Sequence, residues 1–236
     1  MLMLNTPKME GVEAEAVVDP VWKVLIYDKL GLEVISPLLH VGDLRERCVT
    51  VQMPIYSDRQ PIPDAPAIYF VEPTEDNIRR IGSDMASRLY DSMFINFSSA
   101  LPRGLLEQLA SATIQSDAVG LVSQVYDQHL NYVSLEHNLF SLQTSNAYEV
   151  LNNPRTTETQ IEDMTSRIAS GLFSVIATLG SVPVIRCPKG TVAEAIALKL
   201  DSQLRDHLMN SRANIFTDGV QLSRPGDTLH LYKLQS

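Results

Sequence analysis

The chain has 236 residues, of which 44% are hydrophobic and 20% charged, which is enough apolar sequence for one sizeable core and part of a second. Its formal net charge of -9 and its pI near 5.0 argue against nucleic acids and anionic membrane surfaces as direct ligands, because both recruit clustered lysines and arginines. The two cysteines, Cys48 and Cys187, are far apart in sequence, so they indicate neither a disulfide framework nor a zinc site and fit a reducing compartment, the cytosol.

The beginning of the chain predicts an arm followed by a strand and a helix. Residues 1–19 are expected to be flexible, and they lack the basic region and long apolar stretch of a secretory signal. A strand is predicted at 21–28, where VWKVLIYD is short, apolar and rich in β-branched residues. A helix-compatible stretch follows through Leu38, interrupted by Gly31 and ended by Pro37. This order is typical of a first strand and its crossover.

Three further strands are predicted at 49–53, 67–71 and 93–97, each of them short and apolar. A helix is predicted between the last two strands, because Thr74 can cap a helix and apolar residues follow it at helical spacing. The apolar face of this helix consists of Ile78, Ile81, Met85 and Leu89.

The next segment continues the alternation of helices and strands. Pro102 opens a helix, a second short helix is predicted at about 118–125, and 130–133 is predicted to be another strand. Such alternation favours a mostly parallel sheet with helices on both faces. The first domain is therefore expected to close near Leu142.

The helix that begins after Pro102 has more apolar surface than one core contact requires. Two stripes run along it, about a third of a turn apart. One stripe can face the core, and the other indicates either a second buried contact or an exposed groove that receives a partner. The pattern alone favours a helix buried on two sides. The stripes are Leu105, Leu109 and Ala112, and Leu106, Ala110 and Ile114.

The second half of the chain predicts the start of another domain. A polar connection is expected at 144–155, after which Thr157 and Gln160 form a capping box for a long helix to about Leu179. The other expected elements are a strand at 182–186, a helix at 191–209 and a tail from about 217 without an adequate core.

One stretch in this half raises the question of a membrane span. The 18 residues from Ile168 to Ile185 carry no charge. However, serines, glycines and Pro183 dilute the stretch, and its apolar period begins upstream at Ile161. A helix packed in a protein core is therefore the favoured interpretation.

The sequence offers little catalytic chemistry where an open parallel sheet would bind ligands. No G-x-G-x-x-G turn follows the first strand, no G-x-S-x-G elbow occurs, and CPKGT at 187–191 lacks the spacing of a phosphate loop. The histidines include no pair at helical spacing, so neither a metal nor another cofactor is expected. Asp28 is the one carboxylate an enzyme could use, but a structural role as the cap of the following turn is favoured.

Four separated blocks, in the right order, strongly resemble the SM (Sec/Munc-type) family of SNARE-binding regulators of vesicle fusion. Within that family they are most similar to the Sly-type branch, which serves transport between the endoplasmic reticulum and the Golgi. The blocks are PVWKVLIYDKLGLEVISPLL (20–39), SDRQPIPDAPAIYFVEPTEDNI (57–78), QVYDQHLNYVSLEHNLFSL (124–142) and VPVIRCPKGTVAEAIALKLDSQLR (182–205).

The resemblance implies an α/β fold in which residues 20–143 form a parallel five-stranded sheet flanked by helices, the first domain of an SM protein. Residues 144–236 would hold the first helices of an incomplete second α/β domain, with a divergent tail from about 217. Family members are considerably longer than this chain.

The resemblance also implies a function without catalysis. The chain is expected to bind the N-terminal peptide of a Golgi or ER syntaxin, a Qa-SNARE, and so to regulate vesicle docking and fusion. SNARE complexes and tethering factors would be partners of the full-length form. Localisation would be cytoplasmic, with peripheral association to ER and Golgi membranes only through the SNARE. The alternative is a small-molecule or nucleotide-binding α/β enzyme that acts at the carboxyl ends of the strands.

The resemblance further implies where the syntaxin peptide binds. The apolar pocket would be formed by the helix after Pro102 and by the short helix predicted after it. An arginine in the Asp-Arg-Thr core of the family's peptide would need a carboxylate at the rim, for which Glu107 and Asp127 are candidates, with solvated surface roles equally open. A charge at Leu109 is expected to abolish binding and to leave the fold largely intact. The implied pocket residues are Leu106, Leu109, Ala110, Val122 and Val125.

Overall fold

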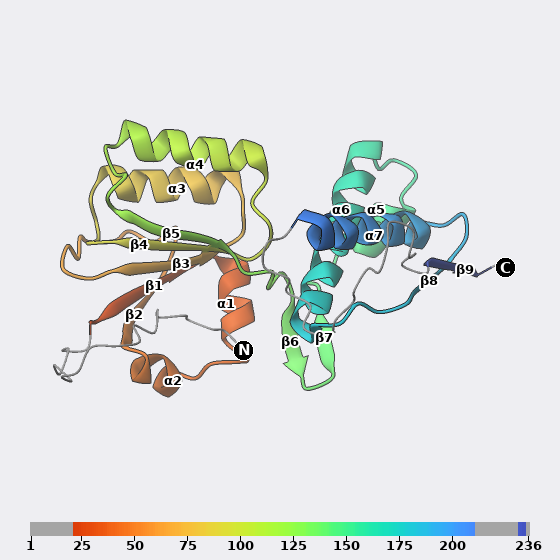
Figure 1. The fold of residues 1–236 in the computed structure, drawn as a ribbon, viewed down its shortest axis with the longest axis horizontal. Helices are drawn as coiled ribbons and strands as arrows, with labels where there is room; N and C mark the ends of the chain where they lie inside the picture. The colour runs from red at the N-terminus through yellow and green to blue at the C-terminus, as the bar shows by residue number, and fades with distance from the viewer. Residues whose placement is uncertain (1–20, 211–230, 235–236) are drawn as a thin grey trace.

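The computed structural model describes residues 21–210 and 231–234, so the predicted arm at 1–19 and most of the tail from 217 lie outside the described part. Two bodies of structure follow one another along the chain (Figure 1). The first contains a parallel sheet of five strands in the order β2-β1-β3-β4-β5, with helices on both faces, as predicted. Its elements are β1 (Lys23–Tyr27), α1 (Lys29–Ile35), α2 (Val41–Glu46), β2 (Val49–Pro54), β3 (Ala67–Val71), α3 (Glu75–Ala86), β4 (Met93–Phe97), α4 (Arg103–Gln115) and β5 (Val122–Asp127).

Two apolar cores lie on the two faces of this sheet. Helices α3 and α4 cover one face, whereas α1 and α2 lie on the other (Figure 1). Alternate residues of β1 divide between them, since Ile26 packs in the core under α3 and α4 and Leu25 in the core under α1. β3 is buried along its whole length because it lies at the centre of the sheet.

The helix predicted at 118–125 is absent from the structure, and this segment forms β5 instead. The chain leaves α4 at Ser116, and Asp117 has a left-handed φ of 49°, which ends the helical run. β5 then pairs in parallel with β4, with Val125 opposite Ile95. Parallel pairing along the edge of the sheet overrides the helical pattern of the short segment.

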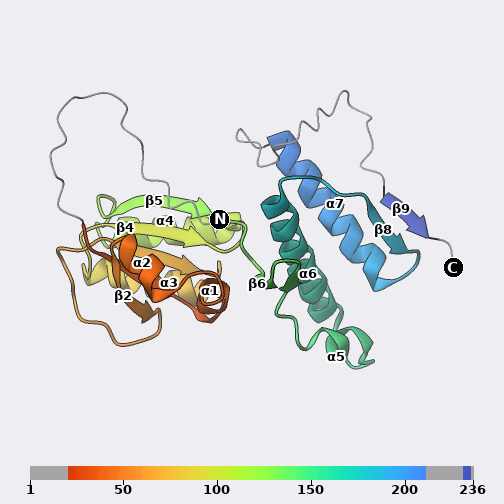
Figure 2. The same ribbon diagram turned by 90° about the horizontal axis from the view of Figure 1, so that it is seen from below.

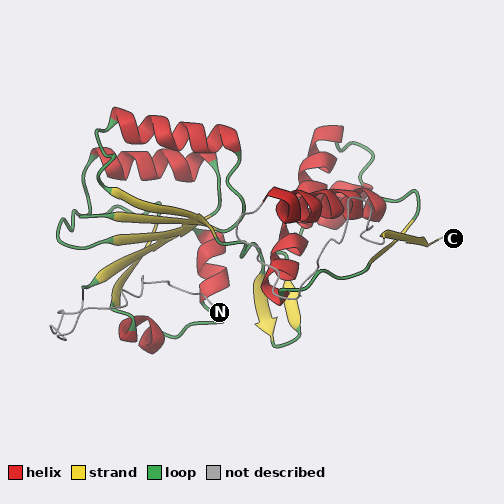
Figure 3. Cartoon of the chain, in the orientation of Figure 1, coloured by secondary structure: helices red, strands yellow, loops and turns green. Residues whose placement is uncertain are grey.

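The strand predicted at 130–133 is also displaced. The structure places β6 at Val133–Glu136, and β6 pairs with β7 (Leu139–Ser141) in an antiparallel hairpin outside the main sheet (Figure 3). The fifth strand of the sheet therefore precedes the predicted position.

Asp28, which directly follows β1, connects this strand with α1, α3 and the end of β3. The backbone N–H of Gly31 donates to its Oδ1 at 2.8 Å and caps α1, as predicted. The backbone N–H of Glu72 and the side-chain amide of Asn77 donate to its Oδ2 at 2.7 and 2.9 Å. Because Asp28 is buried, these charge-assisted bonds hold α1, the end of β3 and α3 together.

A second buried group attaches the loop after β2 to α3. The Arg59 guanidinium donates through Nη2 to both carboxylate oxygens of Asp84, at 2.8 and 3.0 Å, and the Tyr69 hydroxyl donates to the same carboxylate at 2.8 Å. Arg59 and Asp84 are both almost inaccessible to solvent, so removal of one partner would leave the other charge buried and uncompensated.

The second body is mainly helical and contains α5 (Ala147–Asn152), α6 (Glu158–Leu179), β8 (Ile185–Pro188), α7 (Val192–Asn210) and β9 (Leu231–Leu234). The predicted capping box is confirmed, since Thr157 Oγ1 accepts from the Gln160 N–H and the Thr157 N–H donates to Gln160 Oε1. α5 was not predicted, and β8 begins at Ile185 rather than 182. Among the described residues, no helix is sufficiently long and apolar to cross a membrane.

Helices α6 and α7 pack against each other through an apolar seam (Figure 2). Phe173 and Ile176 of α6 meet Leu200 and Leu204 of α7 in this seam. Lys199 of α7 reaches across it and donates to the Thr165 and Ser166 hydroxyls at 2.7 and 2.8 Å. The apolar seam and the hydrogen bonds of Lys199 together hold α6 against α7.

The two bodies meet beyond the carboxyl end of β5. The His129 ring lies 5.2 Å from the Phe173 ring of α6 and 5.8 Å from the His207 ring of α7, between centroids. Arg167 of α6 forms an ion pair with Glu72 at 3.5 Å. Gly171 permits close packing here, since a Cβ on it would lie 2.9 Å from the Leu142 side chain.

Two glycines test the close packing around α1. In Gly31→Ala the new Cβ would lie 2.4 Å from the Phe70 carbonyl oxygen, whereas a Cβ on Gly42 of α2 would meet nothing within 4 Å. We expect Gly31→Ala to lower the free energy of unfolding by about 1–3 kcal/mol. Gly42→Ala should leave it unchanged or raise it by about 0.5–1 kcal/mol. Urea denaturation followed by circular dichroism measures both, and equal stability of the two variants would contradict the packing.

The ring cluster should make the junction sensitive to pH. Burial lowers the pKa of His129, and nearby His207 lowers it further whereas Asp127 raises it; burial also lowers the pKa of His207. Because both pKa values fall below the unfolded value of about 6.5, their contribution to stability is present above that pH and is lost as the pH falls below it.

We therefore expect proteolysis at the junction to accelerate as the pH falls below about 6.5, the unfolded pKa of histidine. The variant His207→Phe keeps a ring beside Phe173 and removes one titrating group. It should show a weaker pH dependence. An identical pH profile for the variant and the unaltered chain would contradict the assignment to this cluster.

Candidate functional site

The candidate site is a corner of the first body between α4 and the edge strand β5. The N-terminal end of α4 lies beside the carboxyl end of β5, since the Leu101 N–H donates to Asp127 Oδ1 at 3.2 Å. Helix and strand therefore run in opposite directions along the corner. Because β5 is the last strand of the sheet, no other strand among the described residues lies on that side of the corner.

The orientation of α4 follows from two contacts. Ala112 faces α3, because a Cβ on Gly82 would lie 3.1 Å from its methyl group. Leu109 faces the sheet and is 3% exposed within the core. Continued rotation in the same sense brings Leu106 and Ala110 to the side of β5, at 100° per residue. Leu106 is 47% exposed, and Ala110 is also exposed.

The strand supplies the other wall of the corner. Val125 lies opposite Ile95, and Val122 opposite Met93, so both valines are on the face of the sheet that α4 covers. Val122 packs partly against the core, whereas Val125 is more exposed. Four of the implied pocket residues therefore line one exposed apolar corner, two from α4 and two from β5 rather than from a second helix.

Leu109 differs from the other four. It is a core residue, as its place in the first apolar stripe implied, although the resemblance also implied a place in the pocket. A charged side chain at this position would enter the packed interior between α4 and the sheet. The burial of Leu109 therefore argues against the expectation that Leu109→Arg leaves the fold largely intact.

The two candidate carboxylates lie at the polar end of the corner, in different settings. Glu107 forms an exposed ion pair with Arg103, one turn earlier on α4, at 2.9 Å. Burial raises the pKa of Asp127, although the Leu101 N–H and the nearby His129 lower it. Asp127 is thus held in place through Oδ1, and a carboxylate has a second oxygen to offer a guanidinium.

Arg103 was not selected from the sequence. Its spacing of four residues before Glu107 on a helix was the signal that could have identified it. In the structure it places a positive charge at the same end of the corner. This end therefore carries charges of both signs and could receive a peptide with both.

The usual ligand site of an open parallel sheet lies where neighbouring connections leave in opposite directions, here between β1 and β3. Asp28, Gly31 and Asn77 fill that crevice with their own hydrogen bonds. The space above the Phe70 carbonyl cannot hold even an extra methyl group on Gly31. Among the described residues, no group of three or more metal-ligating side chains lies together either.

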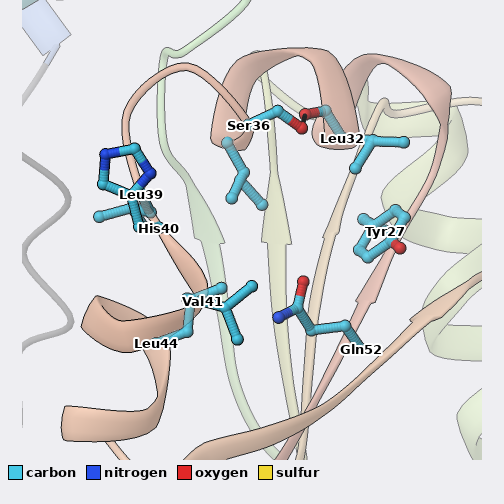
Figure 4. Close-up of a pocket in the computed structure, with 9 residues that line it drawn as sticks. Tyr27, Leu32, Ser36, Leu39, His40, Val41, Leu44 and Gln52 are labelled. Atoms are coloured by element: carbon cyan, nitrogen blue, oxygen red, sulfur yellow. Dashed lines mark hydrogen bonds between the residues drawn. The ribbon is translucent and has the colours of Figure 1, made fainter.

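A pocket of about 270 Å³ lies elsewhere, between α1, α2 and β2 (Figure 4). Leu32, Ile35 and Val41 contribute apolar surface, and His40 and Gln52 bring polar atoms to its wall. The pocket is on the face of the sheet opposite α4, so it is separate from the corner. Its volume is slightly below the range of about 300–1,000 Å³ that is typical of small-molecule sites.

Comparison with known proteins identifies the relatives of this fold. The model of the Sec1 family matches residues 23–229. The chain belongs to the Sec1 family. It is 50% identical over 219 residues to the SEC1 family transport protein SLY1 of Arabidopsis thaliana, which covers 93% of this chain and 34% of the relative. The Sec1 family domain-containing protein 1 of Homo sapiens is 44% identical over 233 residues, with coverage of 97% and 34%.

Solved structures of related proteins have a similar fold. A crystal structure of Sly1p in complex with an N-terminal peptide of Sed5p has a TM-score of 0.77 and 46% identity, over 81% of this chain and 33% of that one. The SM protein Vps45 in complex with the Qa SNARE Tlg2 has a TM-score of 0.71 at 21% identity, over 91% of this chain and 35% of that one, which bears on the fold alone. This Sec1-family chain spans about a third of the length of the relatives it matches.

The difference in burial between Leu106 and Leu109, one turn apart on α4, yields a stability test. We expect Leu109→Arg to destabilise the fold by more than about 3 kcal/mol, because it buries an unpaired charge. Leu106→Arg should change stability by less than about 0.5 kcal/mol, since its side chain can extend into solvent. Thermal unfolding followed by circular dichroism distinguishes them. A cooperative, unshifted transition for Leu109→Arg would show that the structure assigns the core face of α4 incorrectly.

Proposed function

We propose that this chain is a non-enzymatic capture module for the N-terminal peptide of a Golgi or ER syntaxin, and that the corner between α4 and β5 is its binding site. The observation that carries the proposal is the exposed apolar surface of Leu106, Ala110 and Val125 beside the charged end at Asp127. The complex of Sly1p with a Sed5p N-terminal peptide, at 46% identity, supports it.

The chemistry of the corner is suited to a short peptide. An aromatic or aliphatic side chain that becomes fully buried contributes about 1.5–3 kcal/mol. Two such side chains would barely offset an association cost of about 4 kcal/mol or more. A charged contact must therefore contribute, and a peptide arginine between Asp127 and Glu107 would supply it.

The proposed cellular role follows from the peptide. Capture of the syntaxin N-terminal peptide would recruit the protein from the cytoplasm to ER and Golgi membranes. The association would be peripheral, through the SNARE. In a longer polypeptide, SNARE complexes and tethering factors would be further partners in docking and fusion. We propose the division of the chain into residues 20–143, which bind the peptide, and 144–236, the beginning of a second domain.

Titration with the N-terminal peptide of Sed5p tests this function directly by calorimetry. We expect Leu106→Arg to weaken binding by at least about tenfold, because it places a charge against the apolar wall. Leu198→Arg is the matched control, since Leu198 is similarly exposed on α7, and it should bind as the unaltered chain does.

A second arm of the titration examines the charged end. Asp127→Asn keeps an acceptor for the Leu101 N–H and removes the negative charge. It should weaken binding and reduce the dependence of affinity on salt. Unchanged affinity of a folded Leu106→Arg variant would eliminate the corner as the site, and an absence of binding by the unaltered chain would eliminate the function.

A further inference from the structure

The apolar stripe on the β5 side of α4 continues beyond the residues of the proposed pocket. Ile114 lies one turn after Ala110 and two turns after Leu106, in the last turn of the helix. It is 70% exposed, more than Leu106 or Val125. No charged residue separates these three positions on the stripe, so the exposed apolar surface is continuous along α4.

The two ends of the corner have different chemistry. Arg103, Glu107 and Asp127 give the end at the start of α4 its charges. At the other end, Asp117 forms an ion pair with Arg88 at 3.7 Å, and Arg88 also donates to its carbonyl. These two charges therefore bind each other across the ends of α3 and α4, and Ile114 remains the exposed side chain of the last turn on the β5 side.

The geometry sets a distance between the two apolar positions. Eight residues of helix separate Leu106 from Ile114, which corresponds to about 12 Å along α4. An extended peptide advances about 3.3 Å per residue, so a side chain four residues from the first apolar anchor would reach Ile114.

We propose that Ile114 is a second apolar anchor point for the same bound peptide and so determines specificity for an apolar residue four positions from the first anchor. This inference rests on the proposed function of the corner. The occupant is an extended peptide whose charged residue lies at the Asp127 end. Its second apolar side chain packs on Ile114, and continuity with the Leu106 and Val125 surface supports that path.

Alanine replacements in both molecules test the proposal as a double-mutant cycle. The probe is the fluorescently labelled N-terminal peptide of Sed5p, with each of its apolar residues changed to alanine in turn. We expect Ile114→Ala to weaken binding of the unaltered peptide about five- to tenfold. The effect of Ile114→Ala on affinity should vanish with one peptide variant only. In that variant, the residue changed to alanine lies four positions from the peptide residue that a parallel cycle with Leu106→Ala identifies as the partner of Leu106.

Control variants separate the possible failures. Leu198→Ala, on the exposed surface of α7, should bind every peptide as the unaltered chain does, and circular dichroism should show that Ile114→Ala remains folded. Unchanged affinity for Ile114→Ala, with Leu106→Arg still defective, would overturn the second anchor and leave the proposed function standing. If Ile114→Ala lowered the affinity for every peptide variant by the same factor, the second anchor would be overturned as well. If Leu106→Arg also bound normally, the corner would be eliminated as the site and the second anchor with it, whereas the function itself would fail only if the unaltered chain did not bind the peptide.

Discussion

The buried carboxylate of Asp28 is the interaction on which the first body depends. Its two oxygens accept from the backbone of α1, from the backbone after β3 and from the Asn77 side chain of α3. A carboxylate so placed must be satisfied, because an unpaired charge in the interior is costly. Once those bonds are made, α1 and α3, on opposite faces of the sheet, are fixed with respect to the strand ends between them.

The same bonds determine where function can reside. In many open sheets the crevice at this point holds a cofactor, but here Asp28, Gly31 and Asn77 occupy it. A fold that uses its strand ends for its own stability must bind partners elsewhere. Among the described strands, β2 and β5 are the edges of the sheet, and the unpaired backbone groups of an edge strand can receive a partner. The corner beside β5 combines such an edge with an exposed apolar helix face.

Helix α4 illustrates what a helical pattern can and cannot reveal. The two stripes were readable from spacing, and the structure confirms that one of them, with Leu105 and Leu109, packs in the core. Periodicity alone favoured burial of both, yet Leu106 and Ile114 are exposed. The elements that flank a helix are determined by the tertiary structure, which periodicity does not show. They decided between a helix buried on two sides and an exposed apolar face.

The errors in the prediction also have local physical causes. Val122, Val125 and Tyr126 follow helical spacing, and the segment becomes a strand only through its pairing with β4, where a shift in register after Val122 brings both valines to one face. The short helices α2 and α5 were missed, since six residues give too little periodicity to detect. Elements with strong terminal signals were predicted well, as with Thr74 before α3 and Thr157 before α6.

β5 also connects the proposed site with the rest of the chain. Asp127, at the charged end of the corner, is two residues from His129, whose ring packs against Phe173 and His207 of the second body. The two groups interact electrostatically, since His129 lowers the pKa of Asp127 and Asp127 raises the pKa of His129. A cation bound at Asp127 would oppose protonation of His129. By linkage, neutral rings at the junction and a cationic peptide at the corner favour each other.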